Sequence, residues 1–131
     1  KVVLGIGCDR DTPLESIETA VFQALQEAQL SIDNVRSLAS IDKKSDEPGL
    51  LALAEKFHWT IKFYTAHELS QVEVPNPSEV VRKYVGTSAV AEAAALLAAH
   101  TQMQDLIVEK YKYRGQDNRN ATVSIAHDRS S

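Results

Sequence analysis

The sequence has a single cysteine, Cys8, among its 131 residues. One cysteine excludes an internal disulfide framework and is typical of a protein that works in a reducing compartment. The first residues already follow a strand pattern, so we expect no signal peptide and a cytoplasmic protein. Such an abrupt start is typical of a trimmed chain or of a domain taken from a longer one.

Long apolar runs and an excess of positive charge are also missing. The longest strongly apolar run, Ala93–Ala99, is far shorter than the ~20 residues that cross a bilayer. The formal net charge is −4, from 14 basic and 18 acidic residues, so no overall positive field favours nucleic acid or an anionic membrane. The length predicts one domain with its own core. We therefore expect a globular protein whose partners include neither nucleic acid nor membrane.

Hydrophobic periodicity predicts alternating strands and helices. Helices with an apolar stripe are expected from about Leu14 and from about Pro48. Three apolar runs are expected to be strands: Lys1–Gly7, Val35–Ile41 and Trp59–Tyr64. This order of elements is typical of right-handed βαβ units on a parallel sheet.

The C-terminal part predicts a different kind of strand pairing. Asp105–Tyr113 and Ala121–Ala126 are β-like runs separated by the turn-forming segment Arg114–Asn120, which indicates an antiparallel hairpin. The predicted fold is a layered α/β/α domain over residues 1–126, with a largely parallel sheet made mixed by this hairpin. Residues 127–131 are expected to be a frayed tail.

Three loops are expected to meet at one edge of the sheet. Gly5–Asp11, Asp42–Gly49 and Tyr64–Ala66 all follow the carboxyl end of a predicted strand. Open α/β sheets bind their ligands along this edge. The architecture therefore points to Gly5–Asp11 and Asp42–Gly49 as the candidate site.

The stretch Val74–Leu97 contains two predicted helix starts. Asn76 and Pro77 resemble a cap followed by proline at the first helical position, and Thr87 or Ser88 caps the next helix after Gly86. These residues are either purely structural, or their free backbone N–H groups and hydroxyls hold an anionic ligand.

The glycines of the first strand allow two interpretations. Gly5 and Gly7 begin like a dinucleotide-binding fingerprint, but Arg10 stands at the position of the third glycine. The glycines either let the strand pass close to a helix, or let the backbone approach a ligand while Arg10 offers a guanidinium fork to a carboxylate.

Cys8 is a candidate nucleophile at a helix N-terminus. None of the four histidines is placed by the sequence to act as its base, and no spacing typical of metal ligands is present, so we expect no metal site. The histidines are expected on the surface or at edges.

The charged segment Asp42–Glu47 is either a solvated loop or part of the site at the sheet edge. Lys44 and its neighbour offer ammonium donors for carboxylates, and Asp46 and Glu47 offer carboxylates for acid–base chemistry.

Three ordered motifs give the chain a family resemblance: GIGCDRDTP, SIDKKSDEPGLLALA and PNPSEVVRKYVGTSAVAEAAALLAA. Together they closely resemble the C-terminal domain of the cobalamin-biosynthesis protein CbiG and the related small protein CobE, from Val2 to about Ala126. The resemblance implies an α/β domain of vitamin B12 biosynthesis. CbiG is associated with hydrolytic opening of the δ-lactone of cobalt-precorrin-5A, which releases acetaldehyde and gives cobalt-precorrin-5B.

The resemblance implies a cobalt-corrinoid substrate, with cobalt present only as part of that substrate and no cofactor of the chain itself. Asp46 or Glu47 is expected to activate a water. The expected binding residues surround one cleft: Gly5, Gly7, Cys8, Arg10, Asp42, Lys44, Asn76, Ser78, Gly86, Thr87 and Ser88. The expected protein partners are the N-terminal part of CbiG and other enzymes of the pathway.

Three functions remain open on the sequence. The first is a hydrolase domain that processes cobalt-precorrin-5A. The second is a non-catalytic, CobE-like protein that binds or carries a tetrapyrrole. The third is a structural module that has no ligand and docks onto a partner enzyme.

Overall fold

The computed structural model describes residues 1–71, 87–101, 103–116 and 118–128. Within these residues the five strands are β1 (Val2–Cys8), β2 (Val35–Ile41), β3 (Thr60–Tyr64), β4 (Leu106–Arg114) and β5 (Asn120–His127). The helices are α1 (Leu14–Glu27), α2 (Pro48–Phe57), α3 (Ala66–Ser70) and α5 (Thr87–Ala99). Three short 3₁₀ turns complete the description: η1 (Ile32–Asn34), η2 (Asp42–Lys44) and η3 (Met103–Asp105).

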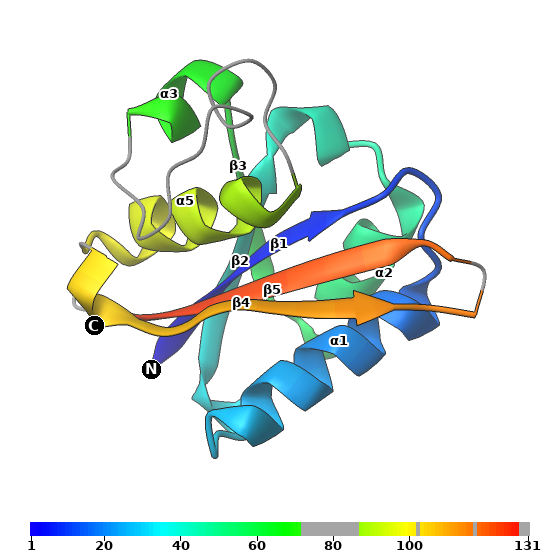
Figure 1. Cartoon of the computed structure of the whole chain (residues 1–131), viewed down its shortest axis with the longest axis horizontal. Coiled ribbons are helices and arrows are strands. Elements are labelled where there is room, and N and C mark those ends of the chain that lie inside the picture. Colours follow the sequence, from blue (N-terminus) through cyan, green and yellow to red (C-terminus); the bar gives the residue numbers. More distant parts are fainter. Residues whose placement is uncertain (72–86, 102, 117, 129–131) are drawn as a thin grey trace.

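The strands form one mixed sheet in the order β3-β2-β1-β5-β4 (Figure 1). β1, β2 and β3 are parallel, whereas β5 runs antiparallel to both β1 and β4. The predicted parallel sheet with a C-terminal antiparallel hairpin is therefore confirmed. Because β5 inserts beside β1, the start of β5 lies at the same edge as the end of β1, with Cys8 opposite Ala121.

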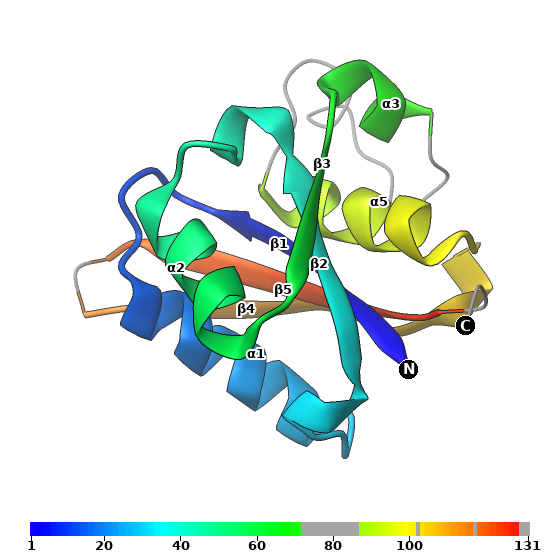
Figure 2. The same cartoon turned by 180° about the vertical axis from the view of Figure 1, so that it is seen from behind.

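Helices cover both faces of the sheet, as the two opposite views show (Figures 1 and 2). The residues of β1 alternate between two cores. Leu4 and Ile6 pack in the cluster that also contains residues of α1 and α2, whereas Val3 packs in the cluster with residues of α5. This alternation is the expected consequence of the two-residue period of a strand. The layered α/β/α arrangement is thus confirmed.

The close approach of α5 to β1 explains one of the glycines. A Cβ atom added to Gly5 would lie 1.8 Å from the carbonyl oxygen of Ala91 and 2.8 Å from the backbone nitrogen of Ala95. No L residue with a side chain fits there without moving the helix backbone. Gly5 therefore lets the strand pass under α5, whose alanine-rich sequence permits the same short separation.

Two local expectations differ from the structure. The sequence around Thr12 resembles a capping box, but Pro13 occupies the N-cap position of α1 and the Thr12 hydroxyl donates to the Asp9 carbonyl at 2.7 Å. The tail was also expected to begin at His127, yet His127 ends β5 and Asp128 is buried. The Asp128 carboxylate accepts a hydrogen bond from Arg36 at 2.9 Å, which holds this residue against β2.

Some expectations lie outside the described residues. The predicted helix start at Asn76 and Pro77 and the predicted turn at Gly86 fall in residues 72–86. Within the described ranges, no helix is both long enough and apolar enough to span a membrane.

Candidate functional site

The candidate site lies at the carboxyl ends of the parallel strands. The loop after β1, the η2 turn after β2 and the first residues of α3 after β3 are found along this edge (Figure 1). The first turn of α5 points toward the end of β1 in both views (Figures 1 and 2). The backbone of Thr87 and Ser88 opens this helix, whereas Gly86, Asn76 and Ser78 lie outside the described residues. The loops expected to gather at one edge thus do so.

Arg10 is the centre of the polar contacts at this edge. Its Nη1 atom donates to Asp46 Oδ1 at 3.0 Å and to Glu47 Oε2 at 2.9 Å. Its Nη2 atom donates to the backbone carbonyl of Lys43 at 3.2 Å. The side chain remains 53% exposed, so the guanidinium is fixed on one side and open to solvent on the other. These contacts bring together residues that the sequence placed on two separate loops.

Glu47 is the buried half of the carboxylate pair. Its side chain is fully buried, its Oε2 accepts from Arg10, and its Oε1 accepts from the backbone N–H of Asp11 at 2.6 Å. The sequence places Glu47 correctly before α2, with Pro48 in the first turn, but the side chain makes no capping hydrogen bond to its own helix. Both oxygens instead fix the loop after β1. Removing Arg10 would leave a buried carboxylate with only one of its two partners, which is costly.

Asp46 is the exposed half of the pair. Its side chain is 77% exposed, and the Arg10 hydrogen bond and charge hold the pKa of this carboxyl below its usual value. The same hydrogen bond and charge, with that of Glu47, raise the pKa of the Arg10 guanidinium. An ion pair between two exposed side chains adds little to stability, because water screens both charges. Of the two predicted catalytic carboxylates, Asp46 is the one that faces solvent.

Cys8 lies at the site but faces the core. Its side chain has no exposed surface, and burial raises the pKa of the thiol to about 11, against a smaller lowering by the nearby charge of Lys44. A thiolate nucleophile needs a lowered pKa and access. Cys8 has neither, so the structure does not bring its sulfur to a ligand.

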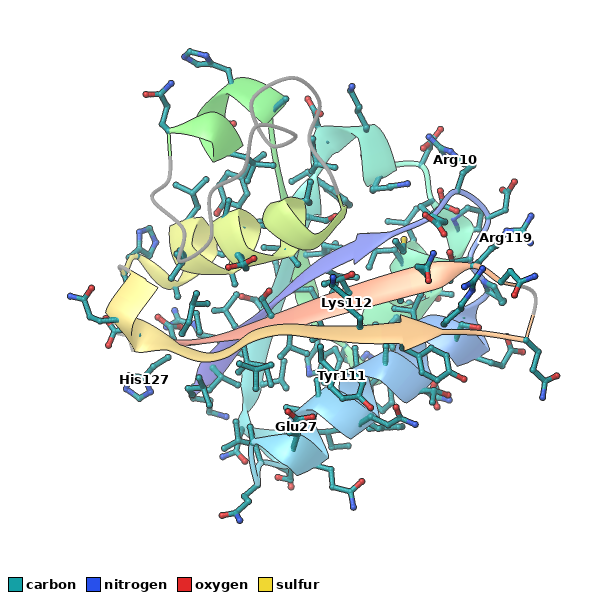
Figure 3. All side chains as sticks on the ribbon, in the orientation of Figure 1. Arg10, Glu27, Tyr111, Lys112, Arg119 and His127 are labelled. Carbon is teal, nitrogen blue, oxygen red and sulfur yellow. The ribbon has the colours of Figure 1, made fainter. Side chains whose placement is uncertain are left out.

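The turn between β4 and β5 adds residues that the sequence did not assign to the site. Asp9 Oδ2 accepts from the Asn120 backbone N–H at 2.8 Å and from Asn120 Nδ2 at 3.1 Å, and Arg119 Nε donates to the Arg10 carbonyl at 3.0 Å. Figure 3 shows Arg10 and Arg119 at the same end of the molecule, on different loops. The signal that finds them is the antiparallel register of β5 with β1, which the sequence does not reveal.

The other predicted binding residues vary in access. Asp42 is exposed in η2, Lys44 is partly buried beside it, and Gly7 is buried within β1 opposite Thr122. Gly5 is covered by α5, so its role in the structure is packing. All four histidines are exposed, as expected. Among the described residues, no group of three or more His, Cys, Asp or Glu side chains is arranged to hold a metal ion.

Two shallow hollows adjoin the loop after β1. One, of about 340 Å³, lies between the starts of α1 and α2 and includes Asp11, Pro13, Glu47 and Ala52 in its walls. The other, of about 310 Å³, lies between α1 and the β4–β5 hairpin. Both hollows are open, so among the described residues a ligand here would lie against the surface of the domain.

The family model for the C-terminus of cobalamin synthesis protein G matches residues 2–126. The chain belongs to this CbiG C-terminal family. It is therefore a protein of cobalamin biosynthesis, homologous to cobalt-precorrin-5A hydrolase and to CobE. The resemblance seen in the three sequence motifs is confirmed.

Curated relatives fall into two groups that differ in length. A cobalt-precorrin-5A hydrolase of Priestia megaterium is 35% identical over 95% of this chain, but the match covers only 32% of the hydrolase. The protein CobE of a Sinorhizobium species is 40% identical over 83% of this chain and 71% of CobE. This CbiG C-terminal domain thus spans about a third of the hydrolase and most of CobE.

The fold agrees with a solved member of the family. A crystal structure of CobE, a protein from the cobalamin biosynthetic pathway, matches with a TM-score of 0.74 and 32% identity. The match covers 95% of this chain and 88% of the CobE chain.

Proposed function

We propose that this CbiG C-terminal domain binds a cobalt-corrinoid precursor at the carboxyl edge of its sheet, as its part in the opening of the δ-lactone of cobalt-precorrin-5A. The observation that carries the proposal is the fixed, half-exposed guanidinium of Arg10 at the ligand edge of a chain from this family. Glu47 and the Lys43 carbonyl hold the Arg10 guanidinium in place, so its solvent-exposed side is preorganised to bind an anion.

The chemistry of the ligand fits this edge. A corrin precursor is a flat apolar macrocycle with several carboxylates on its rim. A guanidinium binds a carboxylate through two parallel N–H donors, and free N–H groups at a helix start add further donors. Arg10 and Lys44 supply cationic groups, and the first turn of α5 lies near the same edge, without a net positive charge on the whole domain.

The two predicted catalytic carboxylates do not serve the proposal equally. Glu47 uses both oxygens to hold Arg10 and Asp11, so its part is to position the loop. Asp46 faces solvent next to Arg10 and is the better candidate to take a proton from an attacking water. The lactone-opening step is proposed only for this domain within a complete hydrolase, because the chain matches about a third of such a protein.

A second candidate function is corrinoid binding without turnover, as a CobE-like protein. The engagement of both Glu47 oxygens and the buried, protonated thiol of Cys8 favour it, since neither group is free for catalysis. The higher coverage of the CobE relative points the same way.

The test is a titration of the purified domain with cobyrinic acid, a cobalt corrinoid with free rim carboxylates, followed by visible absorption. Arg10→Lys is the informative variant because it keeps one positive charge but loses the planar fork, and we expect its affinity to fall about tenfold. Cobinamide, in which the rim groups are amides, serves as the matched ligand and is expected to bind more weakly. Absence of saturable binding of cobyrinic acid by the folded domain would refute the proposed site.

Acetaldehyde release then separates the two candidate functions. Cobalt-precorrin-5A is incubated with the domain alone and with the domain supplemented by the remaining part of a cobalt-precorrin-5A hydrolase. Release only in the supplemented reaction, lost in Asp46→Asn, supports a hydrolase domain. Tight binding with no release in either reaction supports the CobE-like function.

A further inference from the structure

The two carboxylates on Arg10 differ in how permanently they are held. Both accept from the same atom, Nη1, at nearly equal distances of 2.9 Å for Glu47 and 3.0 Å for Asp46. Glu47 is fully buried and has a second, backbone partner in Asp11. Asp46 is 77% exposed and, among the described residues, its side chain is held by Arg10 alone. The hydrogen bond from Arg10 to Glu47 is thus permanent, whereas the one to Asp46 can exchange with an anion from solvent.

The Arg10 guanidinium also has N–H donors that are not yet used. A guanidinium has five N–H donors, and three of those of Arg10 go to Asp46, Glu47 and the Lys43 carbonyl. The other two, on Nη2 and Nε, have no acceptor within the described residues. An incoming carboxylate can therefore approach before Asp46 leaves, and it can then gain a second hydrogen bond that Asp46 does not make.

We propose that Asp46 occupies the place of a ligand carboxylate on Arg10 and is displaced from it when a rim carboxylate of the ligand binds. The identity of the ligand rests on the function proposed above, whereas the exchange itself rests on the Arg10 geometry. Asp46 is in this sense an internal competitor, and Glu47 keeps the guanidinium in place during the exchange.

Two consequences follow from the displacement. In the absence of ligand, Asp46 balances part of the positive charge of Arg10, so an anion in solution has to compete with Asp46 for Nη1. After displacement, the freed Asp46 carboxylate lies beside the bound rim of the macrocycle and no longer has Arg10 as a partner, which makes it a stronger base. The low pKa of Asp46 in the free protein is consistent with a carboxylate held by its partner until then.

The main experiment compares cobyrinic acid binding to the wild-type domain and to Asp46→Asn by calorimetry. Removing the competitor should tighten binding about three- to fivefold, the range expected for release of an exposed ion pair. Because Asp46 is exposed, the variant is expected to fold normally.

The control is Asp33→Asn. It makes the same change of net charge on an exposed residue of η1, which precedes β2 and therefore lies away from the carboxyl edge. Its affinity should stay within about twofold of wild type, because a single distant charge is screened at physiological ionic strength. Wild-type binding with an unchanged or weakened affinity in Asp46→Asn would overturn the exchange and leave the binding function standing. A similar tightening in both variants would assign the effect to net charge and would also overturn it.

A second measurement tests the exchange without any corrinoid. Sodium propionate is titrated into the domain while NMR follows the Arg10 Nε–H and Asp46 carboxyl resonances, with sodium chloride of equal ionic strength as the reference. Both resonances should move together with propionate and stay in place with chloride. If they do so while cobyrinic acid fails to bind, the proposed function falls and the exchange stands. If saturating propionate moves neither resonance, the exchange is refuted.

Discussion

At the scale of single residues, the buried thiol of Cys8 makes stability depend on alkaline pH. Its pKa is about 11 in the folded protein and 9.0 without burial. Between these values the unfolded chain loses the proton while the folded chain keeps it, so stability is intact below pH 9 and falls as pH rises toward 11. The loss should reach roughly 2–3 kcal/mol. Urea unfolding at pH 8 and pH 10.5 measures it.

The control is Cys8→Ala. Losing the side chain lowers the stability of this variant by the same amount at every pH. The variant also has no thiol to ionise, so it lacks that part of the pH dependence. The difference between wild type and variant should therefore shrink at alkaline pH. Two curves that stay parallel from pH 8 to 10.5 would show that the thiol does not ionise differently in the two states.

Residue identities predict Arg10 and Glu47 as members of the site but not how they act. Glu47 stands in the N-cap position of α2, where a local interpretation directs its carboxylate to the first N–H groups of the same helix. Its partner is instead Arg10, 37 residues earlier in the chain. Thr12 behaves in the same way, since its hydroxyl bonds to Asp9 and does not cap α1. A local motif cannot reveal a tertiary partner that competes for the same side chain.

By contrast, the local sequence Thr65–Glu68 has the pattern of a capping box, and Thr65 and Glu68 form one at the start of α3. The Thr65 hydroxyl accepts from the Glu68 N–H at 3.0 Å, and the Glu68 carboxylate accepts from the Thr65 N–H at 2.8 Å. Both groups are exposed and have no competing partner among the described residues, so the local pattern decides the outcome.

At the scale of elements, the close contact between β1 and α5 fixes the position of α5 on its face of the sheet. Gly5→Ala would place a Cβ atom 1.8 Å from the Ala91 carbonyl oxygen. This collision involves the backbone of α5, so a change of side-chain rotamer cannot relieve it. We expect a loss of about 2–3 kcal/mol or more, because α5 must lift from the sheet. Hydrogen exchange should show weakened protection in α5 while α1, on the other face, keeps its protection.

Ala95→Gly is the control for that prediction. It loosens the same interface and costs helix propensity of about 1 kcal/mol, but it causes no collision. A Gly5→Ala variant as stable as wild type would mean that α5 lies farther from β1 than the structure places it.

At the scale of the whole molecule, the sequence predicts the layers of the fold but not which strands lie next to each other in the sheet. The apolar runs and the order of elements suffice for three parallel strands, and the turn-rich segment suffices for a hairpin. Nothing in them specifies that β5 pairs with β1, because hairpin pairing is local whereas insertion beside β1 depends on long-range packing. That insertion brings Asn120 to Asp9 and Arg119 to Arg10, which is why this side of the site could not be predicted.

The same pairing of β5 with β1 extends to His127, one residue past the predicted boundary of the domain. A boundary at residue 126 stays a prediction, and a chain truncated after Ala126 tests it. This truncation removes His127, which is paired with Val2, and Asp128, whose carboxylate accepts from Arg36 at 2.9 Å and whose N–H donates to the Lys1 carbonyl at 3.0 Å. Losing these contacts should cost about 1–3 kcal/mol of unfolding free energy, measured by urea titration.

A chain truncated after Asp128 is the matched control, because it keeps all three contacts, and its stability should lie within about 0.5 kcal/mol of the full chain. Asp128→Ala in the full chain should reproduce part of the loss, since it removes the Arg36 ion pair but keeps the backbone contact to Lys1. Equal stability of the chain ending at Ala126 and the full chain would mean that the two termini fold independently of this contact. In that case residue 126 is the true end of the domain.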